Sequence, residues 1–229
     1  MTENVLQQIE RGDLVDQVVD DITQAIVTGL FQPGARLVES QVGEQLGVSR
    51  GPVREAFRRL EQLGVVEKIP YRGTFVSQLT VDDVRELHDL RAPLEGLAAR
   101  MVAEQNDPRL TERLQKILEE MRTLSPSEDH SRIISLDTDF HDSLIALSGH
   151  GLLQELWPTI GVRLRTFLML KTERLYNSPT EAAALHEPIV DAIAAGDAAA
   201  AERAAYRHAR EAGRQHVRDW SDIHESGAG

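Results

Sequence analysis

Residues 46–76 read LGVSRGPVREAFRRLEQLGVVEKIPYRGTFV, and this stretch decides the fold of the first part of the chain. Near its start, Gly47-Val48-Ser49 predicts a tight turn, with Ser49 at the N-cap of a helix. Apolar residues then recur at three- and four-residue steps until Gly64, a glycine that favours the end of a helix. The stretch therefore begins with a turn and an amphipathic helix.

A β-hairpin is predicted after this helix. Residues 65–69 and 74–76 are rich in β-branched residues, and a Pro-Tyr-Arg-Gly turn separates them. Upstream, residues 13–29 and 40–46 predict two more helices, the first from its helical spacing of apolar residues. Helix, helix, turn, helix and hairpin in this order predict a winged helix-turn-helix.

The rest of the chain predicts helices alone. Its apolar residues follow the helical period in six segments, and the breaks between them contain Pro, Gly, Asn or Ser. We therefore expect a mostly α protein, with a winged helix-turn-helix domain at residues 1–78 and a six-helix antiparallel bundle at residues 79–229. The six helical segments are expected at residues 81–105, 108–123, 127–147, 150–175, 179–195 and 197–221.

Composition and charge narrow the function. The 229 residues include 25 Lys and Arg against 37 Asp and Glu, a formal net charge of −12, which argues against a protein coated in nucleic acid. The sign reverses in residues 48–76, where six basic residues face three acidic ones. The absence of cysteine excludes disulfides and thiolate chemistry, so a transition-metal site needs His and carboxylate ligands.

The sequence shows no targeting signal. Residues 1–12 have no apolar core of a signal peptide, and no uncharged run approaches the ~18 residues of a membrane span. We expect a cytoplasmic protein, associated with the nucleoid when it is bound to DNA.

Arginines form a stripe on the helix within residues 46–76. Arg50, Arg54 and Arg58 are spaced i, i+4 and i+8, so they share a face that diverges from the apolar face. The planar guanidinium matches O6 and N7 of guanine in the major groove and also pairs with phosphate. Arg72 at the hairpin tip would reach the adjacent minor groove or backbone. The alternative is a solvated basic face whose arginines pair with neighbouring acids.

Four residues of the helical part are candidates for metal ligands. Asp137 and His141 are an i, i+4 pair, His186 lies in the middle of an apolar face, and His208 lies among alanines. Such donors converging from three helices would suit zinc first, and nickel or manganese next. The alternatives are hydrogen-bonded core histidines and a helix-surface pair.

Four other histidines have no ligand partner at helical spacing. We expect them to face solvent or to be packed without a role in metal binding. They are His88, His130, His216 and His224.

Arg91 is a candidate for binding an effector. It lies in an apolar helical face, where an unpaired guanidinium would be costly. Either Glu95, four residues on, neutralises it, or it binds an anionic ligand. A metal ion and Arg91 together would hold a small carboxylate, such as an organic acid or a sugar acid. Arg163 is a weaker second candidate, with a surface arginine as its alternative.

The N-terminal third resembles the DNA-binding domain of the GntR family of bacterial transcription regulators. The resemblance rests on the core SRGPVREA and on the wing RGTFV. It implies DNA binding as a dimer to a pseudopalindromic operator. This chain has Tyr71 where the family wing usually has glycine. The resemblance implies operator contacts from Ser49, Arg50 and Arg54, with Tyr71, Arg72 and Gly73 at the wing tip.

The helical part resembles the FCD ligand-binding domain of the FadR-like subfamily. Residues 136–150, LDTDFHDSLIALSGH, and residues 185–210, LHEPIVDAIAAGDAAAAERAAYRHAR, are similar to its two signatures. Six helices rather than seven resemble the VanR-type branch. In many such domains an aspartate and three histidines bind a metal, which implies Asp137, His141, His186 and His208.

We therefore expect a repressor, not an enzyme, whose operator binding is controlled by a small carboxylate at the metal site. One alternative is a metal-dependent hydrolase. It lacks a general base, because His186-Glu187 does not continue into an HExxH motif, and no nucleophile stands beside a base. The other alternative is a regulator in which the metal is purely structural.

Overall fold

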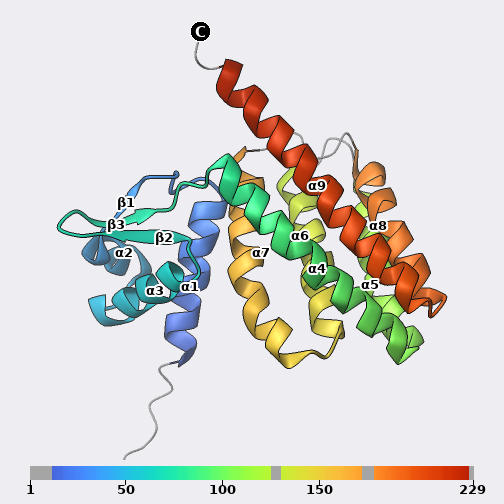
Figure 1. Cartoon of the computed structure of the whole chain (residues 1–229). Helices are drawn as coiled ribbons and strands as arrows, with labels where there is room; N and C mark the ends of the chain where they lie inside the picture. The colour runs from blue at the N-terminus through green and yellow to red at the C-terminus, as the bar shows by residue number, and fades with distance from the viewer. Residues whose placement is uncertain (1–11, 125–129, 172–177, 227–229) are drawn as a thin grey trace, which may run out of the picture. The chain divides into compact units, whose positions relative to one another are not determined.

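The computed structural model describes residues 12–124, 130–171 and 178–226. The chain divides into two compact units, Met1–Gln78 and Leu79–Gly229 (Figure 1), and each is described by itself. Among the described residues, no helix is both long enough and apolar enough to cross a membrane.

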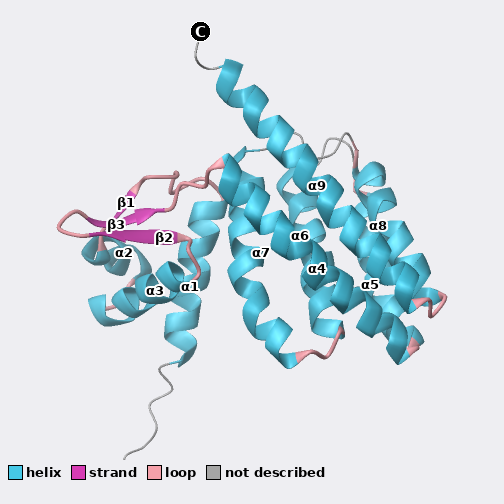
Figure 2. Ribbon diagram, in the orientation of Figure 1, coloured by secondary structure: helices cyan, strands magenta, loops and turns pink. Residues whose placement is uncertain are grey.

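The first unit is a winged helix-turn-helix. Its sheet has the order β1-β3-β2 with both pairings antiparallel, and the strands stand out in magenta in Figure 2. The hairpin prediction is confirmed, but it missed β1, because a strand of two residues shows no alternation. The elements are α1 (Gly12–Val27), β1 (Arg36–Leu37), α2 (Glu39–Leu46), α3 (Arg50–Gln62), β2 (Val66–Ile69) and β3 (Gly73–Val76).

The core of the first unit lies between α1 and α3. Val18, Ile22 and Ile26 of α1 and Val53 and Leu60 of α3 are at most 2% exposed. Burying this one face of α3 leaves the opposite face to solvent, since an α-helix has 3.6 residues per turn.

The second unit is helical in its described residues, which confirms the predicted mostly α fold. Predicted and observed helix boundaries agree closely, and the longest difference is at the end of α9. The predicted segments 127–147 and 150–175 extend partly into positions outside the described residues. The helices are α4 (Val81–Gln105), α5 (Pro108–Thr123), α6 (His130–Leu147), α7 (Gly151–Lys171), α8 (Pro179–Ala194) and α9 (Ala198–Ser226).

Helix α4 is the element around which this unit is built. The contact between α4 and α9 is more extensive than that between any other two described helices, and α4 also contacts α6, α7 and α8 (Figure 1). Two glycines permit the close approach to α9. A Cβ on Gly96 would lie 3.2 Å from the Glu202 carbonyl oxygen, and one on Gly213 would lie 2.6 Å from the His88 Cβ. This packing brings polar residues of four helices, α4, α6, α8 and α9, into one buried cluster.

Candidate functional site

The outer face of α3 carries the three predicted arginines. Arg50, Arg54 and Arg58 are all exposed, on the side of the helix away from its buried face. Two of them already have acidic partners. Arg54 donates to Glu39 of α2 through Nε and Nη2, with a closest distance of 2.9 Å, and Arg58 Nη2 lies 2.5 Å from Glu55. The surface is therefore cationic but partly neutralised by its own carboxylates.

Ser49 occupies the predicted N-cap position of α3, but its side chain does not cap the helix. Its backbone is extended, with φ −70° and ψ 163°, and its hydroxyl accepts no hydrogen bond from the first turn. Ser49 is exposed beside Arg50. The tight turn before it depends on Gly47, whose φ of 67° is left-handed.

The tip of the wing holds Tyr71, Arg72 and Gly73. The Arg72 N–H donates to the Ile69 carbonyl at 3.1 Å and closes a turn with Pro70 and Tyr71 at its centre. Tyr71 has φ 63° in this turn, a conformation that glycine adopts without strain, so the usual glycine of the family has a steric reason. Tyr71 is fully exposed, and the Arg72 guanidinium lies 5.6 Å from the Phe75 ring.

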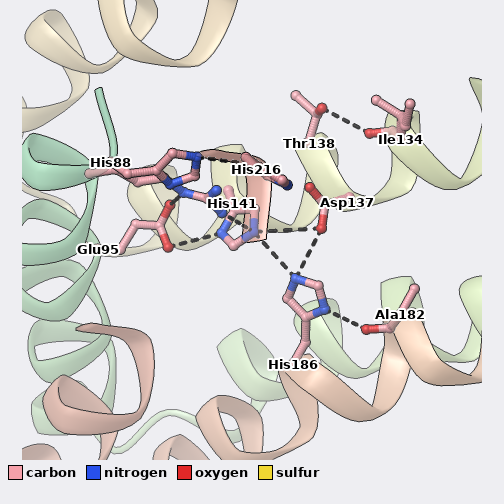
Figure 3. A network of polar contacts seen from close by, with 10 residues as sticks. His88, Glu95, Ile134, Asp137, Thr138, His141, Ala182, His186 and His216 are labelled. Carbon is pink, nitrogen blue, oxygen red and sulfur yellow. Dashed lines mark hydrogen bonds and ion pairs between the residues drawn. The ribbon is translucent and has the colours of Figure 1, made fainter. Parts of the chain in front are cut away.

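The predicted metal ligands meet in the second unit. One ring nitrogen each of His141 on α6, His186 on α8 and His208 on α9 lie within 4.8 Å of one another. Asp137 Oδ1 lies 3.2 Å from His186 Nε2 and 3.8 Å from His141 Nε2 (Figure 3). All four side chains are almost completely shielded from solvent, with His208 the most exposed at 9%. The structure therefore brings together every residue of the predicted ligand set.

Neighbouring groups orient two of the imidazoles. His186 Nδ1 donates to the Ala182 carbonyl at 2.7 Å, and His141 Nδ1 lies 3.1 Å from Glu95 Oε2. In the neutral rings the first contact leaves a lone pair on His186 Nε2, and the Arg91 donor beside His141 Nε2 requires a lone pair there; the two Nε2 atoms are 3.2 Å apart. Acceptor atoms thus face one another and the Asp137 carboxylate, an arrangement that needs a cation among them. The donor set fits a divalent transition-metal ion, and orientation of its histidines by outer hydrogen bonds is typical of such sites.

The charges of the cluster are consistent with this. Burial alone would raise the pKa of Asp137, but hydrogen bonds and positive charge on the side of His141 and His186 lower it well below the usual range, so its anion depends on a proton or a metal ion held between it and these rings. Burial, with the other histidines and Arg91, holds the pKa of His208 well below its usual range. An ionised carboxylate and a neutral imidazole are the forms that ligate metals.

His141 is subject to opposing influences. Burial and Arg91 disfavour a charge on its ring, whereas Glu95 and Asp137 favour one, and the net effect raises its pKa. The Arg91 Nη2 nevertheless lies 2.5 Å from His141 Nε2, where two hydrogens would collide. The arrangement seen here is therefore that of the neutral ring.

The two predicted effector residues have different surroundings. Arg91 is 1% exposed and pairs through Nε with Glu95, which is itself fully buried, while its Nη2 contacts His141. Arg163 is half-buried, and its Nε is shielded without a hydrogen-bond partner. Its charge lies near Asp83, and no contact to the histidine cluster is recorded for it in the described part of the chain.

Sequence reasoning missed a buried histidine pair. His88 Nε2 and His216 Nδ1 lie 2.9 Å apart, 128 residues apart in the sequence, and both rings are at most 5% exposed. Burial lowers the pKa of His88 to about 2 and that of His216 to about 4, with the Arg91 charge acting in the same direction. His88 and His216 are therefore packed, but they also contact each other, which the sequence did not predict. The side chains of His130 and His224 lie outside the described residues.

A winged helix followed by a helical unit with a buried cluster of potential metal ligands defines a DNA-binding regulator. Family comparison agrees: residues 14–76 match the bacterial regulatory proteins of the gntR family, and residues 86–211 match the FCD domain. The chain belongs to the GntR family of bacterial transcription regulators.

Several relatives support this membership. A probable D-xylose utilization operon transcriptional repressor from Paenarthrobacter nicotinovorans is 34% identical over 202 residues, 88% of each chain. The gluconate operon transcriptional repressor of Bacillus subtilis is 28% identical, over 80% of this chain and 76% of that protein. The solved structure of McbR/YncC of E. coli is 25% identical with a TM-score of 0.74, over 86% of this chain and 94% of that one. These relatives are regulators, so the prediction that the chain is not an enzyme is confirmed and the hydrolase alternative is set aside.

Proposed function

We propose that this protein is a repressor that binds a pseudopalindromic operator as a dimer and is controlled by a small carboxylate at a metal ion. The observation that carries the proposal is the convergence of His141, His186 and His208 within 4.8 Å, beside Asp137, in a chain that begins with a GntR-type winged helix. Zinc is the first choice of ion, because a set of three imidazoles and one carboxylate suits it.

The DNA-binding part of the proposal rests on the exposed face of α3. Ser49, Arg50, Arg54 and Arg58 would contact bases and phosphates, and the wing tip at Tyr71 to Gly73 would contact the adjacent backbone. Glu39 holds the Nε and Nη2 edge of Arg54, which leaves the Nη1 side of the guanidinium towards solvent. In a dimer, two such helices would reach half-sites one helical turn apart.

The effector part rests on the chemistry around the metal ligands. A metal ion and the Arg91 guanidinium would present two positive groups to a carboxylate, with Arg163 as a second candidate anchor. Two relatives are named as repressors of operons for a sugar and for a sugar acid, which supports a sugar acid or related organic acid as the effector. Metal and acid would act on DNA affinity through a coupling that is necessarily reciprocal.

The DNA arm of the test begins with selection of the operator from genomic fragments, followed by competition gel shifts. We expect Arg54→Ala to reduce discrimination between operator and random DNA about 5- to 150-fold, the equivalent of 1–3 kcal/mol for one bidentate base contact. Arg109→Ala is the matched control, because Arg109 is an exposed arginine of the second unit that pairs only locally with Asp107. Undiminished discrimination in Arg54→Ala would reject the groove assignment.

The effector arm compares zinc-loaded protein with protein stripped by a chelator. A panel of sugar acids and dicarboxylates is titrated against each form, and operator affinity is measured by fluorescence anisotropy. Release of operator by an acid only in the zinc-loaded form supports a sensory metal. Zinc binding without any effect of the panel, joined to loss of thermal stability on chelation, supports the alternative of a structural metal.

A further inference from the structure

The metal-facing nitrogen of His141 already has a partner from within the chain. Arg91 Nη2 lies 2.5 Å from His141 Nε2, and the same guanidinium pairs through Nε with Glu95. A guanidinium carries only donors, so Nη2–H donates and Nε2 provides its lone pair. This is the lone pair with which His141 would bind a metal ion.

The other nitrogen of the His141 ring, Nδ1, faces the Glu95 carboxylate. Glu95 Oε2 lies 3.1 Å from His141 Nδ1, and an ionised carboxylate only accepts hydrogen bonds. These two atoms lack hydrogen-bond geometry, so the position of the hydrogen rests on Arg91: because its N–H can only donate to Nε2, the hydrogen of the neutral ring lies on Nδ1. Glu95 and Arg91, one turn apart on α4, thus hold the two nitrogens of one imidazole while they pair with each other.

Arg91 supplies the positive charge that this cluster requires. His141 Nε2, His186 Nε2 and Asp137 Oδ1 face one another as acceptors at 3.2 to 3.8 Å. At 1% exposure, the Arg91 guanidinium is shielded from water, and its partners include Glu95 and His141. A divalent ion at the same place would compete with it for His141.

We propose that Arg91 is a tethered cation that occupies the His141 position of the site until a metal ion displaces its Nη2. The displaced guanidinium stays paired with Glu95 through Nε, and its freed Nη2 edge then serves as the anchor for the anionic effector. This inference rests on the proposed function and adds an order to it, with metal first and acid second. An acid that arrived first would have to break the Arg91–His141 contact beside two buried carboxylates, Asp137 and Glu95.

The test measures zinc affinity of the full-length, chelator-stripped protein by competition with a chromophoric chelator. Arg91→Gln should bind zinc about tenfold more tightly than wild type or better, since a hydrogen bond involving a charged group contributes about 1.5–3 kcal/mol. Arg91→Lys should also bind more tightly, because its compact ammonium cannot reach Glu95 and His141 together. Through-space repulsion alone would leave Arg91→Lys at wild-type affinity, because the charge is kept.

Arg100→Gln is the matched control. Arg100 lies on the same helix, is 43% exposed and pairs with Glu104 and Glu202 at 3.6 Å, so its removal should leave zinc affinity unchanged. A wild-type protein that binds zinc, with neither Arg91 variant binding it more tightly, overturns the inference and leaves the metal site standing. A wild-type protein that binds no zinc overturns the proposed metal site and the inference with it.

A measurement on the wild type covers the case in which an Arg91 variant fails to fold. Long-range ¹H–¹⁵N spectra of the metal-free protein at pH 8 report which nitrogen of each histidine carries the hydrogen. We expect His141 to be protonated on Nδ1 and unprotonated on Nε2. A hydrogen on Nε2 would leave no lone pair for Arg91 and would overturn the inference.

Discussion

The molecule contains two arginine–glutamate pairs that look alike chemically and differ in surroundings. On the winged helix, Arg54 and Glu39 have side chains 71% and 33% exposed. In the helical bundle, Arg91 and Glu95 have side chains 2% and 0% exposed. Water screens the first pair and is excluded from the second, so the same two groups interact with very different strength.

The difference separates a surface pair that dissociates at little cost from a buried pair that stays together. Solvent screens an exposed pair, so Arg54 can leave Glu39 for DNA at little cost. Removing one member of a buried pair costs about 3–5 kcal/mol, because the other charge is left without solvent. A metal ion that displaces Arg91 from His141 can therefore do so only if the Arg91–Glu95 pair stays intact.

The largest expected effect comes from breaking the buried pair. Glu95→Ala should lower the free energy of unfolding of the metal-free protein by about 3–5 kcal/mol and its Tm by roughly 6–20 °C. Glu39→Ala is the matched control and should cost less than about 1 kcal/mol. Differential scanning calorimetry measures both, and equal losses in the two variants would remove the distinction drawn above.

A smaller loss of stability is expected from crowding the contact between α4 and α9. Gly213→Ala places a Cβ 2.6 Å from the His88 Cβ, so α9 or the His88 ring must shift. We expect a loss of about 1–3 kcal/mol, the usual cost of overpacking. Gly151→Ala, where a Cβ meets nothing within 4 Å, should be neutral or slightly stabilising. Urea titration checks both variants. An unchanged stability of Gly213→Ala would show that the packing of α9 on α4 adjusts to an added methyl group at little cost.

An effect of similar size concerns the loss of stability in acid. His88 and His216 titrate near pH 6.5 when the chain is unfolded, but burial lowers their pKa to about 2 and about 4 in the folded protein. The unfolded state therefore takes up more protons as the pH falls below 6.5, and stability is lost from there down towards pH 4. For the two groups together we expect about 2–3 kcal/mol less stability at pH 5.5 than at pH 7.5.

The matched comparison for this pH dependence is the double variant His88→Gln/His216→Gln. It keeps polar groups at both positions but cannot take up a proton there. Its stability should fall less steeply between pH 7.5 and pH 5.5 than that of the wild type, in urea titrations at each pH. An identical slope would mean that the pair does not contribute to acid sensitivity.

Features that depend on helical period were predictable from the sequence. The arginine stripe on α3 and the Asp137–His141 pair both follow from which residues share a helix face, whereas the joining of that pair with His186 and His208 was implied by the resemblance to the FCD domain. Features that depend on how helices are set against each other were not. The His88–His216 contact requires the register of α4 on α9, which two glycines determine by close approach. The contact between Glu95 and His141 requires the packing of α4 on α6, and no spacing along either helix reveals it.

The wing tip has a consequence of its own. Tyr71 adopts a left-handed backbone that costs an L-residue about 1–2 kcal/mol, and its ring is fully exposed, so the fold gains nothing from it. The exposed phenol of Tyr71 can stack on another ring and can donate a hydrogen bond. A molecule that approaches the wing tip therefore meets an exposed phenol next to the exposed Arg72 side chain.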